Sequence, residues 1–534
     1  MNKIEQGDKY STSLSMVELV FESSKLVVKI LPILTMAVLS KEQEIKDKHF
    51  AKIGVEMRLF FEKRGGLFPK FGQLLSHRQD LFPEALCREL LPLTEKVPSF
   101  DGLVAQSILE KEVPHLKLKQ FDLTPVGAAS IAQVHRAVLS TGEEVAIKIQ
   151  RPQVEQQIKR DLKNLQSFVK IIDFLHVLPP LQDIFEEFKS WMLDQELHFL
   201  KEAQNLARAA KPSSFSPVFD TNIPMQNLIP KVYPKYCTDR VLVMQFMKGR
   251  TLSNIAKIQD LPLPERKQIV IQALRSFMKQ FVVDGFFQAD PHLSNLIQTE
   301  KGELFFIDWG LVSEFSNQNA IHLLRMYRGF IFKDANLCWD GVTRLMKMSE
   351  VDKRKITPFF KRIFAKFASD SRFMLDRPYR EAGAEFLIAL MHVIVKYKIY
   401  IPAEASLAFK TMATTDAVYT SVCPEVTIRD MLEPALDISQ LFITKLMAES
   451  GIVNLILEKG AGTDGTQMSA KINEWKNMPL VGDWVIKFFN QMKLIDAQQN
   501  IEDLLNNEKL LKMRLRQIQE IENLWLSLQT PEEI

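Results

Sequence analysis

The sequence has few cysteines and few glycines, and it carries no recognisable zinc-binding pattern. Its four cysteines are far apart and form no Cys-x-x-Cys pair, which excludes a zinc ribbon or disulfide framework and indicates a reducing compartment. The 20 glycines and 25 prolines among 534 residues exclude collagen-like or low-complexity sequence. The nine histidines show neither His-x-x-x-His nor His-Glu-x-x-His spacing, so a zinc hydrolase is not expected.

Neither sign of charge dominates the chain. The 68 lysines and arginines against 65 aspartates and glutamates leave a formal charge of +3, which argues against a nucleic-acid partner bound through bulk charge. Hydrophobic residues make up 46% and charged residues 25%, as is typical of globular proteins. The length alone predicts two to four domains.

Long hydrophobic runs are also missing. The apolar segment from Ser15 to Ser40 contains four charged residues, and Pro32 is expected to interrupt it. The uncharged run over 30–40 and the segment over 479–492 are too short to span a bilayer. Each segment is interpreted either as an ordinary packing helix or as a peripheral membrane attachment.

The order of predicted elements is helices, a small antiparallel sheet with a long helix, and then a mostly helical half. This order is compatible with an α+β, bilobal protein-kinase-like fold that has extra N-terminal and C-terminal helices. The glycine-rich stretch over 460–466 is the best linker candidate. The predicted domains are an N-terminal segment, a helical extension, an N-lobe, a C-lobe, and a linker with C-terminal helices, over 1–45, 46–117, 118–248, 249–450 and 451–534.

Three short motifs carry the chemistry. In Val145-Ala146-Ile147-Lys148, strand alternation places Lys148 where it can reach phosphate oxygens. Asp290 and Asn295 are five residues apart in a loop after a helix, as in a kinase catalytic loop, and Asp308 follows a strand and precedes Gly310. Each match alone is weak, because surface strands end in lysine and such aspartates also form turns. Their order and spacing together indicate a nucleotide site that uses ATP and Mg²⁺.

A glycine-rich phosphate loop is absent where one is expected. The chain instead has Gly127, Ala128, Ala129 and Ser130 before the lysine strand. Because alanine adopts a positive φ only at a cost, this loop is predicted to be stiffer than a glycine loop and to place phosphates differently.

These motifs resemble the UbiB (ADCK) family of atypical kinase-like proteins, which is associated with ubiquinone and prenyl-quinone biosynthesis. Lys70-Phe71-Gly72-Gln73 is similar to the family's Lys-x-Gly-Gln, and the alanine-bearing loop is similar to its Ala-rich loop. The sequences VAIKIQRP, FFQADPHLSN and FFIDWG also fit. The resemblance is specific over about residues 65–312, and it does not cover the first ~45 or last ~80 residues.

The resemblance implies a role for each matching residue. Lys148 would bind phosphates and Glu202 would be its helix partner. Asp290 would be the catalytic aspartate. The metal ligands would be Asn295 and Asp308. Lys70 and Gln73 would lie on a helical extension folded over the site, which would disfavour protein substrates. Lys70, Gln73 and Glu196 would also take part in binding the cofactor, as would the loop residues Gly127, Ala128, Ala129 and Ser130.

The sequence departs from the family at three positions. The family's Glu-x-Asp is Glu196-Leu197-His198, the residue two before the catalytic aspartate is Gln288, and Asp-Phe-Gly is Asp-Trp-Gly. His198 is expected to make the lid contact pH-sensitive. No departure removes a metal ligand, so nucleotide binding is still expected.

The predicted function is an atypical kinase or ATPase that uses Mg-ATP and supports ubiquinone or related prenyl-quinone biosynthesis. The alternatives are a nucleotide-binding scaffold that organises lipid-biosynthetic partners, or a protein kinase. Expected partners are ATP or ADP, a lipid or quinone precursor or quinone-biosynthesis proteins, and a peripheral membrane contact. The expected location is the cytoplasm or a membrane surface in a bacterium, and a mitochondrion or plastid in a eukaryote.

Overall fold

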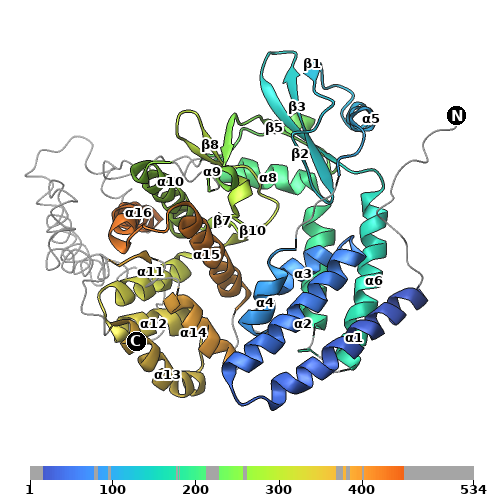
Figure 1. Cartoon of the computed structure of the whole chain (residues 1–534). Helices are drawn as coiled ribbons and strands as arrows, with labels where there is room; N and C mark the ends of the chain where they lie inside the picture. The colour runs from blue at the N-terminus through green and yellow to red at the C-terminus, as the bar shows by residue number, and fades with distance from the viewer. Residues whose placement is uncertain are drawn as a thin grey trace, which may run out of the picture. The chain divides into compact units, whose positions relative to one another are not determined.

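The computed structural model describes residues 16–76, 78, 82–93, 98–175, 178–179, 181–211, 228–256, 261–368, 377–379, 385–397, 399 and 402–449. The expected linker over 460–466, the C-terminal extension over 451–534 and the first 15 residues lie outside them. The chain divides into two compact units, and Figure 1 labels most of the helices and strands that they contain. Unit 1 is Met1–Arg208, Pro230–Met247 and Asp308–Gly310, and unit 2 is Ala209–Ile229, Lys248–Ile307 and Leu311–Ile534.

Unit 1 combines a helical bundle with an antiparallel sheet. Its helices are α1 (Met16–Leu39), α2 (Gln43–Arg64), α3 (Phe68–Ser76), α4 (Glu84–Leu90), α5 (Gly102–Glu112), α6 (Val154–Phe174), α7 (Gln182–Trp191), the π-helix η1 (Met192–Glu196), α8 (Phe199–Ala209) and the 3-10 turn η2 (Pro234–Tyr236). Its strands are β1 (Leu118–Phe121), β2 (Gly127–Ala128), β3 (Ala132–Leu139), β4 (Glu144–Gln150) and β5 (Val241–Gln245). The strand order is β1-β3-β4-β5, with β2 also paired to β3.

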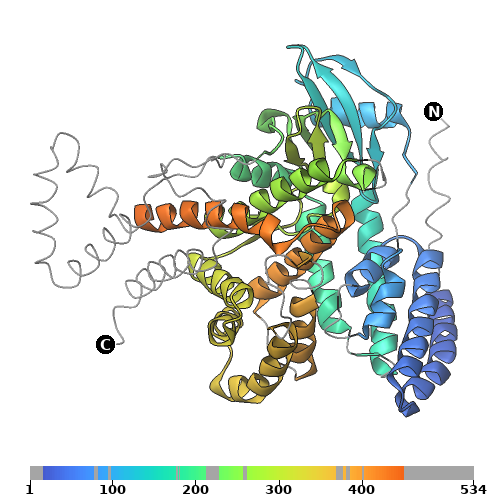
Figure 2. The ribbon, with the colours of Figure 1, turned by 60° about the vertical axis from the view of Figure 1, so that its left-hand side comes forward.

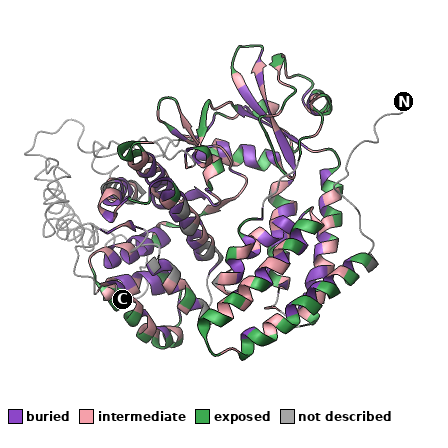
Figure 3. Ribbon diagram, in the orientation of Figure 1, coloured by how far each residue is buried: buried purple, intermediate pink, exposed green. Residues whose placement is uncertain are grey.

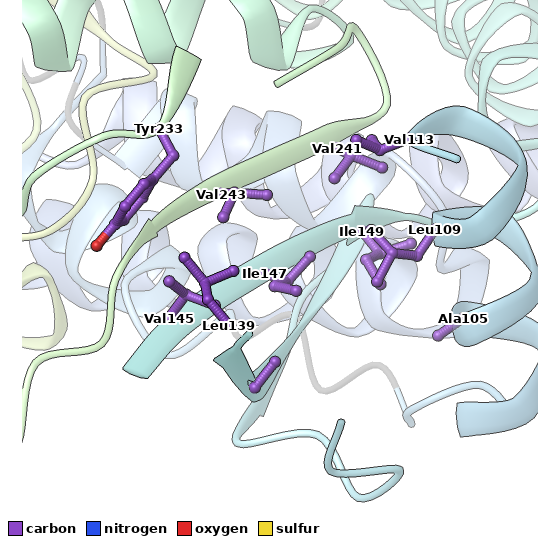
Figure 4. Packing of buried hydrophobic residues seen from close by; sticks show 11 residues of the cluster. Ala105, Leu109, Val113, Leu139, Val145, Ile147, Ile149, Tyr233, Val241 and Val243 are labelled. Atoms are coloured by element: carbon purple, nitrogen blue, oxygen red, sulfur yellow. The ribbon is translucent and has the colours of Figure 1, made fainter. Parts of the chain in front are cut away.

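The two faces of this sheet serve different purposes. Val145, Ile147 and Ile149 of β4 point to a core that also contains Leu109 and Val113 from α5 and its C-terminal end (Figure 4). Because side chains alternate along a strand, Ala146 and Lys148 point to the opposite face. The register pairs Lys148 with Leu242 of β5, so the lysine lies in a central strand.

The N-terminal helices pack beside α6 (Figure 2). Phe60 of α2 stacks on Phe168 of α6 with ring centroids 5.1 Å apart, and Phe68 of α3 meets both rings edge-on. Helix α1 runs unbroken through Pro32, so the expected interruption is wrong. A proline inside a helix removes one backbone hydrogen bond. Ile30 and Ala37, on either side of Pro32, are both buried, and this packing holds the helix together across the proline.

Unit 2 is mostly helical. Its helices are α9 (Leu252–Ile255), α10 (Leu263–Met278), the π-helix η3 (Lys279–Asp284), the 3-10 turn η4 (Leu293–Asn295), α11 (Asn317–Ile331), α12 (Ala335–Leu345), α13 (Glu350–Ala368), α14 (Glu385–Lys396), α15 (Ala403–Val422) and α16 (Ile428–Glu449). Its short strands are β6 (Gly249–Thr251), β7 (Phe286–Gln288), β8 (Leu296–Thr299), β9 (Leu304–Phe306) and β10 (Val312–Glu314). Sheets β6-β8-β9 and β10-β7 are antiparallel. The predicted α+β class is therefore confirmed.

Candidate nucleotide site

Lys148 and Glu202 form a buried ion pair in unit 1. The Lys148 Nζ lies 2.8 Å from the Glu202 Oε2, and the two side chains are 17% and 6% exposed. The pair joins the central strand β4 to helix α8. The Lys148 ammonium also lies 4.9 Å from the ring centroid of Phe199. The prediction that these two residues are partners therefore corresponds to a direct contact.

Asp308 adds a third charge to this pair. Burial opposes the charge of Lys148, but Glu202 and Asp308 outweigh it and hold the pKa of the ammonium above its usual value. Burial, with the charge of Asp308 as a smaller contribution, raises the pKa of Glu202 to about 7 against the pull of Lys148. The structure thus brings Lys148, Glu202 and Asp308 together.

Lys70 reaches the same cluster from helix α3. Its Nζ lies 2.9 Å from the Glu196 Oε1 and 4.7 Å from the ring centroid of Trp191. The π-helix η1, which ends at Glu196, turns this carboxylate toward α3, and such local widening of a helix is frequent at functional sites. Glu196 in turn contributes to the pKa of both Lys148 and Glu202. The Lys-x-Gly-Gln lysine therefore belongs to the cluster.

Gln73 and Gly72 hold helix α3 in place. The Gln73 amide donates to the Leu93 carbonyl at 2.7 Å, so this contact lies within the helical extension. A Cβ on Gly72 would collide with the side chains of Phe61 and Leu93. Glycine at this position therefore lets α3 approach α2 closely, which in turn places Lys70.

His198 points elsewhere. Its Nδ1 lies 3.4 Å from the Asp239 Oδ1, and both side chains are substantially exposed. The contact of Lys70 is with Glu196 instead. The expectation that His198 makes the lid contact pH-sensitive receives no support from this geometry, because the exposed imidazole and Lys70 have different partners.

The alanine-bearing loop is a short hairpin. Gly127 and Ala128 form β2 and pair with Val134 and Gln133 of β3. The Ala129 amide donates to the Ala132 carbonyl at 2.8 Å. Gly127, Ala128 and Ala129 are exposed and Ser130 is half-buried. The region predicted as a loop is therefore half strand, because its backbone finds hydrogen-bond partners on β3.

Two residues that the motifs did not single out support the site. Arg151 donates from its Nε to the Ala129 carbonyl at 2.9 Å and from a terminal nitrogen to the Pro98 carbonyl at 2.7 Å. Asn205 donates to the Trp309 carbonyl at 3.0 Å. Asn205 is three residues after Glu202 on α8, a spacing that puts both on one face of the helix. In the sequence, this spacing from Glu202 was the feature that could have identified Asn205.

The segment around Asp308 is held tightly within unit 1. Trp309 is fully buried, and the Gly310 amide donates to the Asp308 Oδ1 at 2.9 Å. Glu196, Glu202 and Asp308 place three carboxyl groups beside the ammonium groups of Lys70 and Lys148.

Asp290 and Asn295 lie close together in unit 2. The Asn295 amide nitrogen donates to the Asp290 carbonyl at 3.3 Å, which leaves the amide oxygen as the atom able to hold a metal. The Ile307 amide donates to the Asn295 carbonyl at 3.0 Å, and the Thr411 hydroxyl donates to the Ala289 carbonyl at 3.1 Å. Thr411 is more than 100 residues away in sequence, so no local signal identified it.

Carboxylate and amide oxygens fit Mg²⁺. Within the described ranges, no group of three or more histidine, cysteine, aspartate or glutamate residues is arranged to hold a metal ion. Mg²⁺ is commonly bound through one or two carboxylates together with phosphate oxygens. Asp308 and Asn295 supply oxygens of the required kind.

The comparisons with known sequences agree with the motifs. Residues 92–340 match the ABC1 atypical kinase-like domain. A "Probable protein kinase UbiB" from Pseudomonas fluorescens is 28% identical over 402 residues, which cover 72% of this chain and 71% of that protein. Another from Sodalis glossinidius is 30% identical over 295 residues, covering 53% of this chain and 52% of that protein. The solved structure of Rv3197 with erythromycin from Mycobacterium tuberculosis covers 77% of this chain and 96% of its own, with a TM-score of 0.44 and 19% identity.

Proposed function

The chain belongs to the UbiB (ADCK) family of atypical kinase-like proteins, and from this we propose that it binds ATP with Mg²⁺ and uses it in phosphoryl transfer or hydrolysis. The convergence of Lys148, Glu202 and Asp308 in unit 1 carries this proposal. A buried lysine kept protonated by two carboxylates is suited to bind phosphate oxygens. We propose further that this activity supports ubiquinone or related prenyl-quinone biosynthesis.

Each residue has a defined part in the proposed reaction. Glu202 orients the Lys148 ammonium through their ion pair, and Lys148 binds the phosphates of ATP. Asp290 orients or deprotonates the acceptor, which is water or a small molecule. Bound Mg²⁺ would supply charge neutralisation at the phosphates, with Asn295 and Asp308 as its protein ligands. Lys70 and Glu196, on α3 and η1, form the lid that disfavours protein acceptors.

Replacing Asp308 tests the proposal. Asp308→Asn keeps the shape and removes the charge, so Mg²⁺-dependent ATP binding measured by calorimetry is expected to be lost. Asp239→Asn is the matched control, because Asp239 is an exposed partner of His198 and its variant is expected to bind normally. Unchanged binding by Asp308→Asn would contradict the assignment.

His198 motivates a second candidate function. Where the family has an aspartate, this chain has a histidine whose contact is with Asp239. We propose as the alternative a nucleotide-binding scaffold for lipid-biosynthetic partners, without turnover. Tight Mg-ATP binding with no ATP hydrolysis, and hydrolysis gained by His198→Asp, would favour this alternative. Hydrolysis by the wild-type chain that is lost in Asp308→Asn would favour the enzyme.

We also propose peripheral membrane contact through α1. No described helix is both long and apolar enough to cross a membrane. Figure 3 shows much of α1 as exposed or half-buried, and its exposed side chains include Phe21, Val28, Leu31 and Leu39. Exposed apolar residues on an amphipathic helix suit an interfacial position. Liposome flotation is expected to fall in Phe21→Ser with Leu31→Ser, and equal flotation would refute this contact.

A further inference from the structure

Unit 2 contains an apolar cavity of about 150 Å³. Residues of α10, η3, α11, α15 and α16 form most of its wall; Figure 1 labels the four α-helices among these elements. None of the residues assigned above to the nucleotide site lines it. A cavity of about this size accommodates a single benzene ring in other proteins, so this one suits a small ligand.

One part of the cavity wall is polar. Tyr327, Tyr379, Asp416 and Tyr419 all line it. The Tyr379 hydroxyl donates to the Asp416 Oδ1 at 2.5 Å, and the Tyr327 hydroxyl donates to the Met412 sulfur at 3.3 Å. Tyr419 is 2% exposed, and its hydroxyl has no hydrogen-bond partner within the described part of the chain. Burying a hydroxyl without a hydrogen bond lowers the stability of the fold. A ligand in the cavity can supply the missing hydrogen bond.

Asp416 has no cationic partner among the residues that the structure describes. The residue is 8% exposed, and only burial and the hydrogen bond from Tyr379 act on its carboxyl there. Burial raises the pKa of its carboxyl to about 7, against the hydrogen bond from Tyr379. Arg328 also lines the cavity but has interactions of its own. Buried carboxylates in proteins are normally paired with a cation.

We propose that this cavity binds a small hydrophobic ammonium ion. Its ring or short hydrocarbon body occupies the apolar part, lined by residues such as Phe277 and Leu324. Its N–H groups donate to the Asp416 carboxylate and to the unpaired Tyr419 oxygen. The phenol rings of Tyr379 and Tyr419, whose centroids are 6.4 Å apart in an edge-on arrangement, add attraction between cation and aromatic ring.

The carboxylate distinguishes an ammonium ion from a neutral alcohol of the same shape. An alcohol satisfies the Tyr419 hydroxyl but does not pair with the ionised form of Asp416, which an ammonium ion stabilises. A hydrogen bond between two charged groups is about twice as strong as one between neutral groups. The site therefore prefers the cation.

Three probes with the same ring and different heads test this preference. Benzylamine, benzyl alcohol and toluene are titrated calorimetrically into the full chain without nucleotide, which keeps the test independent of the proposed ATP chemistry. Benzylamine is expected to bind at least about tenfold more tightly than benzyl alcohol, and toluene most weakly. Equal affinities for benzylamine and benzyl alcohol, or no binding of benzylamine at millimolar concentration, would overturn the proposal.

Two variants locate the binding. Asp416→Asn keeps an acceptor for Tyr379 and is expected to weaken benzylamine binding about tenfold or more. Tyr419→Phe removes only the unpaired hydroxyl and is expected to weaken binding several-fold without loss of fold. Tyr397→Phe is the control, because Tyr397 lies in unit 2 outside the cavity wall. Unchanged benzylamine affinity in folded Asp416→Asn would also overturn the proposal.

Discussion

The ion pair between Lys148 and Glu202 permits a quantitative test of how the site is built. Replacing Lys148 with methionine leaves the Glu202 carboxylate, 6% exposed, facing Asp308 without its cation. Breaking a buried pair by removing one partner costs about 3–5 kcal/mol. Glu202→Gln is expected to cost less, because Asp308 remains as a partner charge for Lys148.

A double-mutant cycle isolates the interaction of the pair. Lys148→Met combined with Glu202→Gln removes both charges, so its cost is expected to be less than the sum of the single costs. A coupling free energy of about 2 kcal/mol or more is expected for contacting groups in a buried network. The free energies of unfolding come from urea titrations at pH 8 followed by circular dichroism.

The pair formed by Lys159 and Glu155 on α6 is the control. Its atoms are 2.5 Å apart, but both side chains are about 60% exposed (59% and 61%), so solvent screens the interaction. Its coupling is expected to be far smaller than that of the Lys148 pair. Equal couplings in the two cycles would refute the conclusion that burial makes the site's ion pair strong.

Three further predictions concern other parts of the structure. Gly72→Ala is expected to lower the free energy of unfolding by about 1–3 kcal/mol through overpacking, measured by urea titration, whereas Gly127→Ala, whose Cβ would meet nothing within 4 Å, should be neutral. Asn205→Ala leaves the Trp309 carbonyl unpaired and is expected to weaken Mg-ATP binding several-fold in calorimetry; unchanged affinity would contradict a positioning role. Because the folded-state pKa of Asp416 lies at about 7, above the ordinary 3.8, stability should fall as pH rises from about 4 to 7, by up to about 4 kcal/mol. In Asp416→Asn, the free energy of unfolding should no longer fall between about pH 4 and 7. An unchanged slope in the variant would contradict the raised pKa of Asp416.

Much of the fold followed from local patterns. The strand near Arg240–Met247 and the strands over 296–298 and 304–307 were predicted from apolar runs and turn residues, and β5, β8 and β9 confirm them. The prediction that Pro32 interrupts the first helix was wrong, because the tertiary packing of α1 outweighs the low helix propensity of proline. The π-helical segments η1 and η3 were not predicted, since their widened hydrogen bonding has no distinct sequence pattern.

The site was predictable where it was carried by motifs. Lys148, Glu202 and Asp308 were identified from spacing and resemblance, and the structure places them together. Arg151 belongs to the VAIKIQRP motif, but the sequence did not predict its hydrogen bond to the Ala129 carbonyl. That contact depends on how the chain returns to the hairpin after β4, and a one-dimensional pattern does not contain this information.

By itself, the sequence determined the class of fold, the absence of a disulfide framework and the identity of the charged residues at the candidate nucleotide site. These features follow from composition, periodicity and short motifs, which are local. Only the tertiary structure decided that Lys70 pairs with Glu196, 126 residues away, and that His198 pairs with Asp239. Only it revealed the unpaired Tyr419 hydroxyl near Asp416 in an apolar cavity of unit 2. Burial and pairing of charges depend on which distant segments pack together, and that packing sets pKa values and binding preferences.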